Sequence, residues 1–174
     1  AEERDLDTEW AEDFLRMIMT ASLAHQSNEQ FPRSTREPKQ IAIIGGKGAM
    51  GSLYTRIGNL TGHEIHAIDK DNWDTFDQIA PQLDLAIVSV PINVTVDVIE
   101  QLSSKLNKDT VLADFTSNKT QPLEAMMKAH DGPVVGLHPM HGPDVPNLSK
   151  QLMVVCEGRR PEEADWFIQQ CDLW

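Results

Sequence analysis

Apolar residues along most of the chain alternate between short continuous runs and helical spacing, and this pattern predicts a mixed α/β fold. The continuous runs predict strands at residues 41–44, 64–68, 83–90, 110–114, 134–137 and 152–156. Apolar residues at three- and four-residue steps predict helices at 49–60, 74–79, 93–106, 122–130 and 162–171. Strands and helices that alternate in this way are typical of a Rossmann-type, doubly wound and mostly parallel sheet.

The first 39 residues do not follow this alternation. Trp10, Phe14, Met17 and Ile18 share one face of a predicted helix at 8–25, and this apolar face needs a partner to cover it. Residues 27–39 are polar and proline-containing, which indicates a linker. We therefore expect a Rossmann-type domain at 40–174, preceded by a linker and a helix.

Composition narrows the possible partners. The chain of 174 residues has a formal net charge of -12, so binding to nucleic acid or to an anionic membrane surface is not expected. Cys156 and Cys171 lack the spacing of a metal site or a disulfide framework, so we expect no metal and a reducing cytoplasm. No apolar run approaches the ~20 residues that a membrane-spanning helix needs.

The strongest motif is the glycine-rich run from Gly46 to Gly51, which follows a predicted strand and opens a predicted helix. This is the context that a G-x-G-x-x-G dinucleotide fingerprint requires. We expect Gly46 to form the tight turn, Gly48 to let the backbone approach a pyrophosphate, and Gly51 to allow close packing of helix and strand. Ala49 and Met50 begin the helix, so their N–H groups would face the phosphates.

Asp69 favours NAD as the cofactor. It ends the second predicted strand, close to the ~20 residues past the glycines at which an acidic residue binds the adenosine ribose. A carboxylate accepts hydrogen bonds from a 2′-hydroxyl and repels a 2′-phosphate, although Lys70 beside it reduces this repulsion.

Three polar segments follow other predicted strands: Ser89-Val90-Pro91, residues 114–119 and residues 136–143. Ligands of open α/β sheets bind at the carboxyl ends of the strands, where these segments are expected to gather. A histidine at this edge can accept the proton of an alcohol that is being oxidised. The residues themselves leave open whether His138, His141 or neither has this role.

Taken in order, these motifs resemble the prephenate dehydrogenases, and more closely those fused to a chorismate mutase. The resemblance is carried by the glycine run, Ser89-Val90-Pro91, Asp114-x-x-Ser117-x-Lys119 and His138-Pro139-Met140-x-Gly142-Pro143. It implies an NAD-dependent oxidative decarboxylation of prephenate to 4-hydroxyphenylpyruvate, in tyrosine biosynthesis.

The resemblance also implies roles for single residues. His138 would bond to the ring hydroxyl of prephenate, and Ser117 would support this hydroxyl and the histidine. His141 stands where relatives often have phenylalanine, so we interpret it as a neighbour of the site. Lys119 is expected either to hold a carboxylate or to cap a strand end.

The predicted helix at 8–25 is similar to the last helix of a chorismate mutase domain. In that helix a serine and a glutamine one turn apart reach the ligand, and Ser22 and Gln26 have this i, i+4 spacing; a polar stripe at a helix end is the alternative. The resemblance thus implies that residues 1–26 belong to a mutase that acts on chorismate. It also implies a helical carboxy-terminal domain beyond this chain, which forms a homodimer and supplies an arginine for the substrate carboxylate.

Two other functions remain open. The first is an arogenate dehydrogenase or another reductase with this cofactor fold, although the His138 segment argues against an imine reductase. The second is a non-enzymatic dinucleotide-binding module, because we expect the chain to be the cofactor-binding portion of a longer enzyme.

Overall fold

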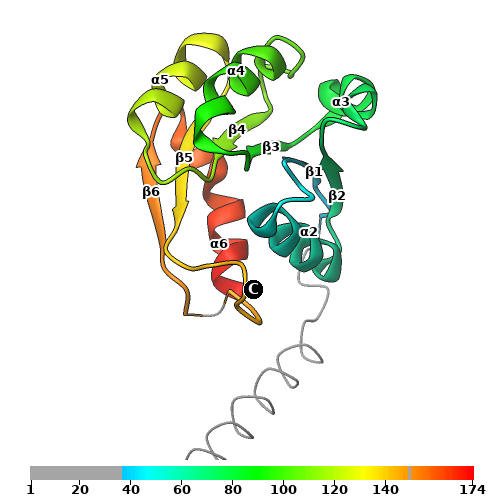
Figure 1. Ribbon diagram of the computed structural model, residues 1–174. Helices are drawn as coiled ribbons and strands as arrows, with labels where there is room; N and C mark the ends of the chain where they lie inside the picture. Colours follow the sequence, from blue (N-terminus) through cyan, green and yellow to red (C-terminus); the bar gives the residue numbers. More distant parts are fainter. Residues whose placement is uncertain (1–36, 149) are drawn as a thin grey trace, which may run out of the picture. The chain divides into compact units, whose positions relative to one another are not determined.

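The computed structural model describes residues 37–148 and 150–174, and a six-stranded sheet lies at its centre (Figure 1). The strands are β1 (Gln40–Ile44), β2 (Glu64–Ile68), β3 (Leu85–Val88), β4 (Val111–Asp114), β5 (Val134–Pro139) and β6 (Met153–Glu157). Their spatial order is β2-β1-β3-β4-β5-β6. Within the described residues β6 is antiparallel to β5 and the other pairs are parallel, which confirms the predicted α/β class.

The strand order reverses at β1, and this reversal defines where a ligand can bind. β2 lies on one side of β1, whereas β3 and the later strands lie on the other. In open α/β sheets a crevice forms at such a switch point, outside the carboxyl ends of the two strands. Here the crevice is expected past Ile44 and Val88, the last residues of β1 and β3.

Helices cover both faces of the sheet. They are α2 (Ala49–Thr61), α3 (Trp73–Ile79), α4 (Ile92–Ser103), α5 (Thr120–Ala129) and α6 (Asp165–Leu173), with 3₁₀ turns η1 (Ala80–Gln82) and η2 (Pro161–Ala164). Figure 1 shows α4 and α5 on one side of the sheet and α2 and α6 on the other. Because both faces are covered, β3 and residues 41–44 of β1 are buried, which explains their uninterrupted apolar sequences.

Several predicted boundaries differ from the structure. The helix after β3 was expected to begin at residue 93, but α4 begins at Ile92 and Pro91 occupies the N-cap position without a side-chain cap. The strand expected at 83–90 is shorter because η1 precedes it and residues 89–91 leave the sheet. β5 extends two residues past the expected end because Pro139 pairs with Met153 of β6.

Some sequence predictions lie outside the described residues. These are the helix at 8–25, with Ser22 and Gln26, and the linker up to residue 36. In the described part of the chain, no helix has the length and apolar character needed to cross a membrane. No group of three potential metal-ligating side chains is found among residues 37–148 and 150–174.

His130 should make stability depend on pH. Its side chain is buried, and its Nε2–H donates to the Thr110 carbonyl oxygen at 2.8 Å. Burial lowers the pKa of His130 below its ordinary value, partly opposed by this hydrogen bond. The unfolded chain, with a histidine pKa of about 6.5, therefore binds more protons, and the folded state loses stability as the pH falls below that value.

We expect the urea midpoint of the wild-type protein to fall more between about pH 7.5 and about pH 5.5 than that of His130→Gln. The glutamine amide can donate a hydrogen bond to Thr110 but does not titrate in this range. Equal decreases in the two proteins would contradict this origin of the pH dependence.

Candidate functional site

A cavity of about 770 Å³ lies at the switch point of the sheet. Its walls come from the ends of β1, β2 and β3 and from one side of α4. The residues from the strand ends and the turns that follow them are Ile44, Gly45, Gly48, Asp69, Lys70, Trp73, Ser89, Val90 and Pro91. The cavity is thus formed largely by segments that the sequence singled out.

The turn after β1 is anchored to the neighbouring strand. The backbone N–H groups of Gly45 and Gly46 donate to the Ile68 carbonyl oxygen at 2.7 and 3.3 Å. Gly45 has a φ of 85°, in the left-handed region that favours glycine. Gly46 lies in the same turn, and the left-handed conformation is adopted by the residue before it.

The other glycines allow close approaches of backbone to backbone. A Cβ at Gly46 would lie 2.7 Å from Cα of Ala67, and one at Gly51 would collide with the Gly45 carbonyl oxygen. A Cβ at Gly48 would meet only this carbonyl, at 3.1 Å, so the other side of Gly48 is open toward the cavity. Gly51 therefore packs α2 on the turn, and Gly48 leaves room for a ligand to approach the backbone.

Helix α2 begins directly behind this turn. Gly48 is its N-cap, without a side-chain cap, and Ala49 and Met50 are its first residues. The first N–H groups of a helix lack partners within the helix and carry its positive dipole end. No acidic residue lies in the first turn of α2, so this end can accept an anion such as a pyrophosphate.

Asp69 lies at the end of β2 and lines the cavity. Its Oδ2 accepts a hydrogen bond from the Lys47 backbone N–H at 2.8 Å, which ties the glycine turn to β2. The Lys47 side chain points elsewhere, with its Nζ 2.5 Å from Asp71 Oδ2. The hydrogen bond from Lys47 holds the pKa of Asp71 below its ordinary value. Asp69 therefore places a carboxylate at the cavity next to the glycine turn.

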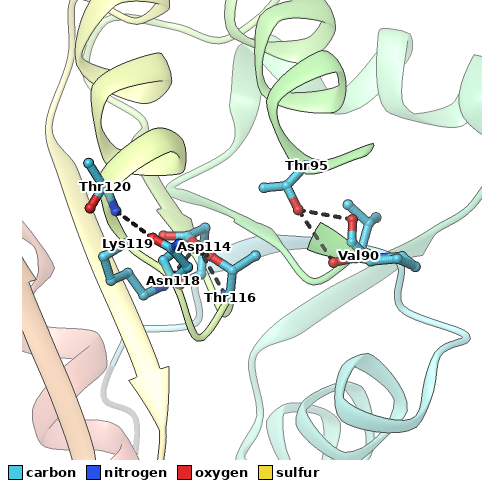
Figure 2. A network of polar contacts seen from close by, with 8 residues as sticks. Val90, Thr95, Asp114, Thr116, Asn118, Lys119 and Thr120 are labelled. Atoms are coloured by element: carbon cyan, nitrogen blue, oxygen red, sulfur yellow. Dashed lines mark hydrogen bonds and ion pairs between the residues drawn. The ribbon is translucent and has the colours of Figure 1, made fainter. Parts of the chain in front are cut away.

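The segment after β3 forms the opposite wall. Ser89 N–H donates to the Ile44 carbonyl oxygen at 2.8 Å and so continues the pairing of β1 and β3. Figure 2 shows Thr95 of α4 folded back on this segment, with its Oγ1 3.1 Å from the Pro91 carbonyl oxygen and 3.5 Å from that of Val90. Ser89, Val90 and Pro91 are thereby held against the cavity, as predicted.

A buried carboxylate organises the loop after β4 (Figure 2). Asp114 is 0% exposed, and its Oδ2 accepts hydrogen bonds from Thr116 N–H at 3.0 Å, from Thr116 Oγ1 and from Lys119 Nζ at 2.7 Å. Lys119 also donates to the Asp114 carbonyl oxygen at 3.1 Å, so it caps the strand end. Burial lowers the pKa of Lys119, and the charge of Asp114 opposes this effect.

Ser117 lies within this organised loop. It is exposed, and no side-chain hydrogen bond of Ser117 is found in the described part of the chain. The donors on either side of it, Thr116 and Lys119, both bind Asp114. The backbone around Ser117 is therefore anchored at the carboxyl edge of the sheet, and its side chain is exposed.

The two candidate histidines have different surroundings. His138 lies inside β5, opposite Val154 of β6, rather than just past the strand as expected from the sequence. Its Nδ1 is buried without a hydrogen-bond partner among the described residues. His141 has both ring nitrogens bonded: Nε2 is 3.2 Å from Tyr54 Oη, and Nδ1 is 2.9 Å from the Gly142 carbonyl oxygen.

The predicted residues thus fall in two groups along one edge of the sheet. Gly48, Asp69, Ser89, Val90 and Pro91 line the cavity. Ser117 and His138 do not; they lie at the ends of β4 and β5, two adjacent strands farther along the sheet. The sequence analysis did not predict that Asp114 organises this loop. A signal for this role was present, because an acidic residue ends an apolar strand and a lysine follows it five residues later.

Residues 55–165 match the family described as "Prephenate dehydrogenase, nucleotide-binding domain". The chain is 41% identical over 163 residues to the T-protein of Enterobacter agglomerans, covering 94% of this chain and 43% of that protein. It is 38% identical over 174 residues to the T-protein of Haemophilus influenzae, covering 100% of this chain and 46% of that protein. The chain therefore spans less than half the length of these relatives.

The fold is also similar to that of a solved enzyme. Prephenate dehydrogenase from Aquifex aeolicus, in complex with hydroxyphenyl propionate and NAD⁺, matches with a TM-score of 0.58 and 14% sequence identity. The match covers 80% of this chain and 59% of that chain. At this identity the likeness describes the fold alone.

Proposed function

The chain belongs to the family of prephenate dehydrogenase nucleotide-binding domains, and from this premise we propose that it binds NAD and forms the cofactor-binding part of an enzyme that oxidises prephenate. The observation that carries the proposal is the meeting of the glycine turn, the start of α2 and Asp69 at one cavity. The T-protein name of the relatives and the NAD⁺ in the solved enzyme support it.

The residues at the cavity fit each part of a dinucleotide. The open side of Gly48 and the first N–H groups of α2 would bind the pyrophosphate. Asp69 would accept hydrogen bonds from the adenosine ribose. Ser89, Val90 and Pro91 follow β3, which lies between β1 and β4, so the nicotinamide would lie on the side of Ser117 and His138.

Bound NAD would supply the hydride acceptor, and a side chain of the protein would have to accept the proton. In the proposed reaction a hydride leaves the ring of prephenate, the ring hydroxyl loses its proton, and carbon dioxide is released as the ring becomes aromatic. We assign His138 as the acceptor of this proton and Ser117 as the group that aligns the hydroxyl. His141 is a poorer candidate, since Tyr54 and Gly142 already occupy its two nitrogens.

The hydrogen bonds of His141 agree with this assignment. A carbonyl oxygen can only accept, so Nδ1 of His141 must donate to Gly142, and Nε2 must then accept from the Tyr54 hydroxyl. To receive a substrate proton, His141 would first have to lose the bond to Tyr54. Neither ring nitrogen of His138 has a hydrogen-bond partner in the described chain, and because Nδ1 is buried, the substrate proton would go to Nε2.

The proposal extends to the whole protein on the evidence of its relatives. We propose that it also isomerises chorismate, with Ser22 and Gln26 reaching that ligand, and that it acts as a homodimer. We further propose a cytoplasmic location. This is supported by the sequence, in which Cys156 and Cys171 lack the spacing of a disulfide framework.

Cofactor preference tests the role of Asp69. We expect NAD to bind more tightly than NADP, because the Asp69 carboxylate accepts from a 2′-hydroxyl and repels a 2′-phosphate. Asp69→Ala should narrow the difference, whereas Asp71→Ala, which leaves Asp69 in place, should retain a preference for NAD. Calorimetric titration with both nucleotides measures this, and tighter binding of NADP by the unmodified protein would contradict the assignment.

The reaction itself is tested by following NADH absorbance with prephenate and NAD. Formation of NADH together with 4-hydroxyphenylpyruvate supports the proposal. Turnover of arogenate but not of prephenate would instead make the protein an arogenate dehydrogenase. NAD binding without turnover of either substrate would instead indicate a non-enzymatic dinucleotide-binding module.

A further inference from the structure

Tyr54 lies where three functional segments meet. It belongs to α2, three residues after the last glycine of the turn, and is 1% exposed. Its ring centroid is 4.4 Å from that of Phe115, which follows β4, and 6.1 Å from that of His141, which follows β5. The buried side chain of Tyr54 therefore connects α2 to the loop that carries Ser117 and to the segment after His138.

The contact to His141 is directional as well as apolar. Burial raises the pKa of Tyr54, so the phenol keeps its proton and donates to His141 Nε2 across 3.2 Å. His141 Nδ1–H in turn donates to the Gly142 carbonyl oxygen at 2.9 Å. The two hydrogen bonds fix the tautomer of His141 and hold the backbone at Gly142.

Both partners of Tyr54 are close in sequence to the proposed reacting groups. Phe115 is two residues before Ser117, and His141 is three residues after His138. On its other side, Tyr54 is in the same helix as Ala49 and Met50, whose N–H groups face the proposed pyrophosphate site. Small displacements between reacting groups and the cofactor lower the reaction rate strongly, because a shift of about 1 Å can reduce a rate on the order of a hundredfold.

We infer that Tyr54 and His141 are positioning residues. They hold the segments that carry Ser117 and His138 at a fixed position relative to α2, the helix whose first N–H groups face the proposed pyrophosphate site. This inference rests on the proposed function for its catalytic part. Packing alone needs only the two aromatic rings, which Tyr54→Phe retains. Positioning also needs the hydroxyl, which this substitution removes.

The test compares Tyr54→Phe, His141→Phe and the double variant in the form of the protein that oxidises prephenate. Loss of one hydrogen bond should lower kcat about three- to tenfold, while the Kd and the KM for NAD stay unchanged. The double variant should be no slower than the single ones, because all three lack the same bond. His66→Phe is the control: His66 Nε2 bonds to Gln40 Oε1 at 2.8 Å on β2, away from these segments, and kcat should not change.

A second measurement does not depend on turnover. Met140 N–H donates to the Leu152 carbonyl oxygen at 2.8 Å, so its hydrogen exchange reports on the segment between His138 and His141. We expect exchange at Met140 to be faster in Tyr54→Phe and His141→Phe than in the wild-type protein or His66→Phe.

The outcomes separate this inference from the proposed function. A wild-type protein without prephenate oxidation contradicts the proposed function, and Met140 exchange then decides the inference alone. Unchanged kcat and unchanged exchange in Tyr54→Phe overturn the inference. So do multiplicative losses in the double variant, which would mean that Tyr54 and His141 act independently. A loss of NAD affinity as large as the loss of kcat also overturns it, since this would mean that Tyr54 acts only through the stability of α2.

Discussion

His138→Asn is expected to lower kcat for prephenate by about 10²–10⁴-fold, the usual contribution of a general base. Asparagine has a similar size and can still form hydrogen bonds, but it cannot accept the proton that leaves the ring hydroxyl. NAD affinity should change little, because the glycine turn and Asp69 lie at β1 and β2 whereas His138 lies in β5. Steady-state kinetics and an NAD titration on the same variant measure both effects.

The matched comparison is His141→Asn. Because this substitution removes a positioning contact to Tyr54 and not the base, its effect on kcat should stay near tenfold or below. A large loss in His141→Asn together with nearly normal activity in His138→Asn would reverse the assignment of the base. Large losses in both would mean that the two histidines act together.

The architecture could be predicted from the sequence because its central strands are buried on both faces. β1 and β3 are continuous apolar runs, and the glycines directly after β1 allow few other arrangements. The last residues of β5 could not be predicted in this way. Their extension depends on pairing with β6, and the local sequence contains no information about this partner.

The site could be predicted only in part, for a similar reason. Residues of motifs within one segment, such as Gly48 of the glycine run and Asp69, line the cavity. The exact glycine in the left-handed turn depends on how Gly45 packs against Ser89, in another strand. The hydrogen bond from Tyr54 to His141 joins residues 87 positions apart, and no periodicity of the sequence indicates such a contact.

Asp114→Ala is expected to lower the free energy of unfolding by about 3–5 kcal/mol, the usual cost of removing one partner of a buried ion pair. The side chains of Asp114 and Lys119 are 0% and 11% exposed, so the substitution leaves the ammonium group largely buried without its counter-charge. The N–H of Thr116 would also lose its acceptor. Urea denaturation of the variant and the wild-type protein measures the difference.

Asp84→Ala provides the control, because Asp84 has similar partners but is more exposed. Its Oδ1 is 3.0 Å from Lys39 Nζ and its Oδ2 accepts from the Gln40 N–H at 2.8 Å, whereas its side chain is 34% exposed. Water screens such a pair, so we expect its loss to cost about 1 kcal/mol. Adding Lys119→Met to Asp114→Ala should recover part of the lost stability, because it removes the unpaired charge. Equal costs for the two alanine variants would mean that burial does not determine the contribution of Asp114, and that the loop carrying Ser117 is held by other contacts.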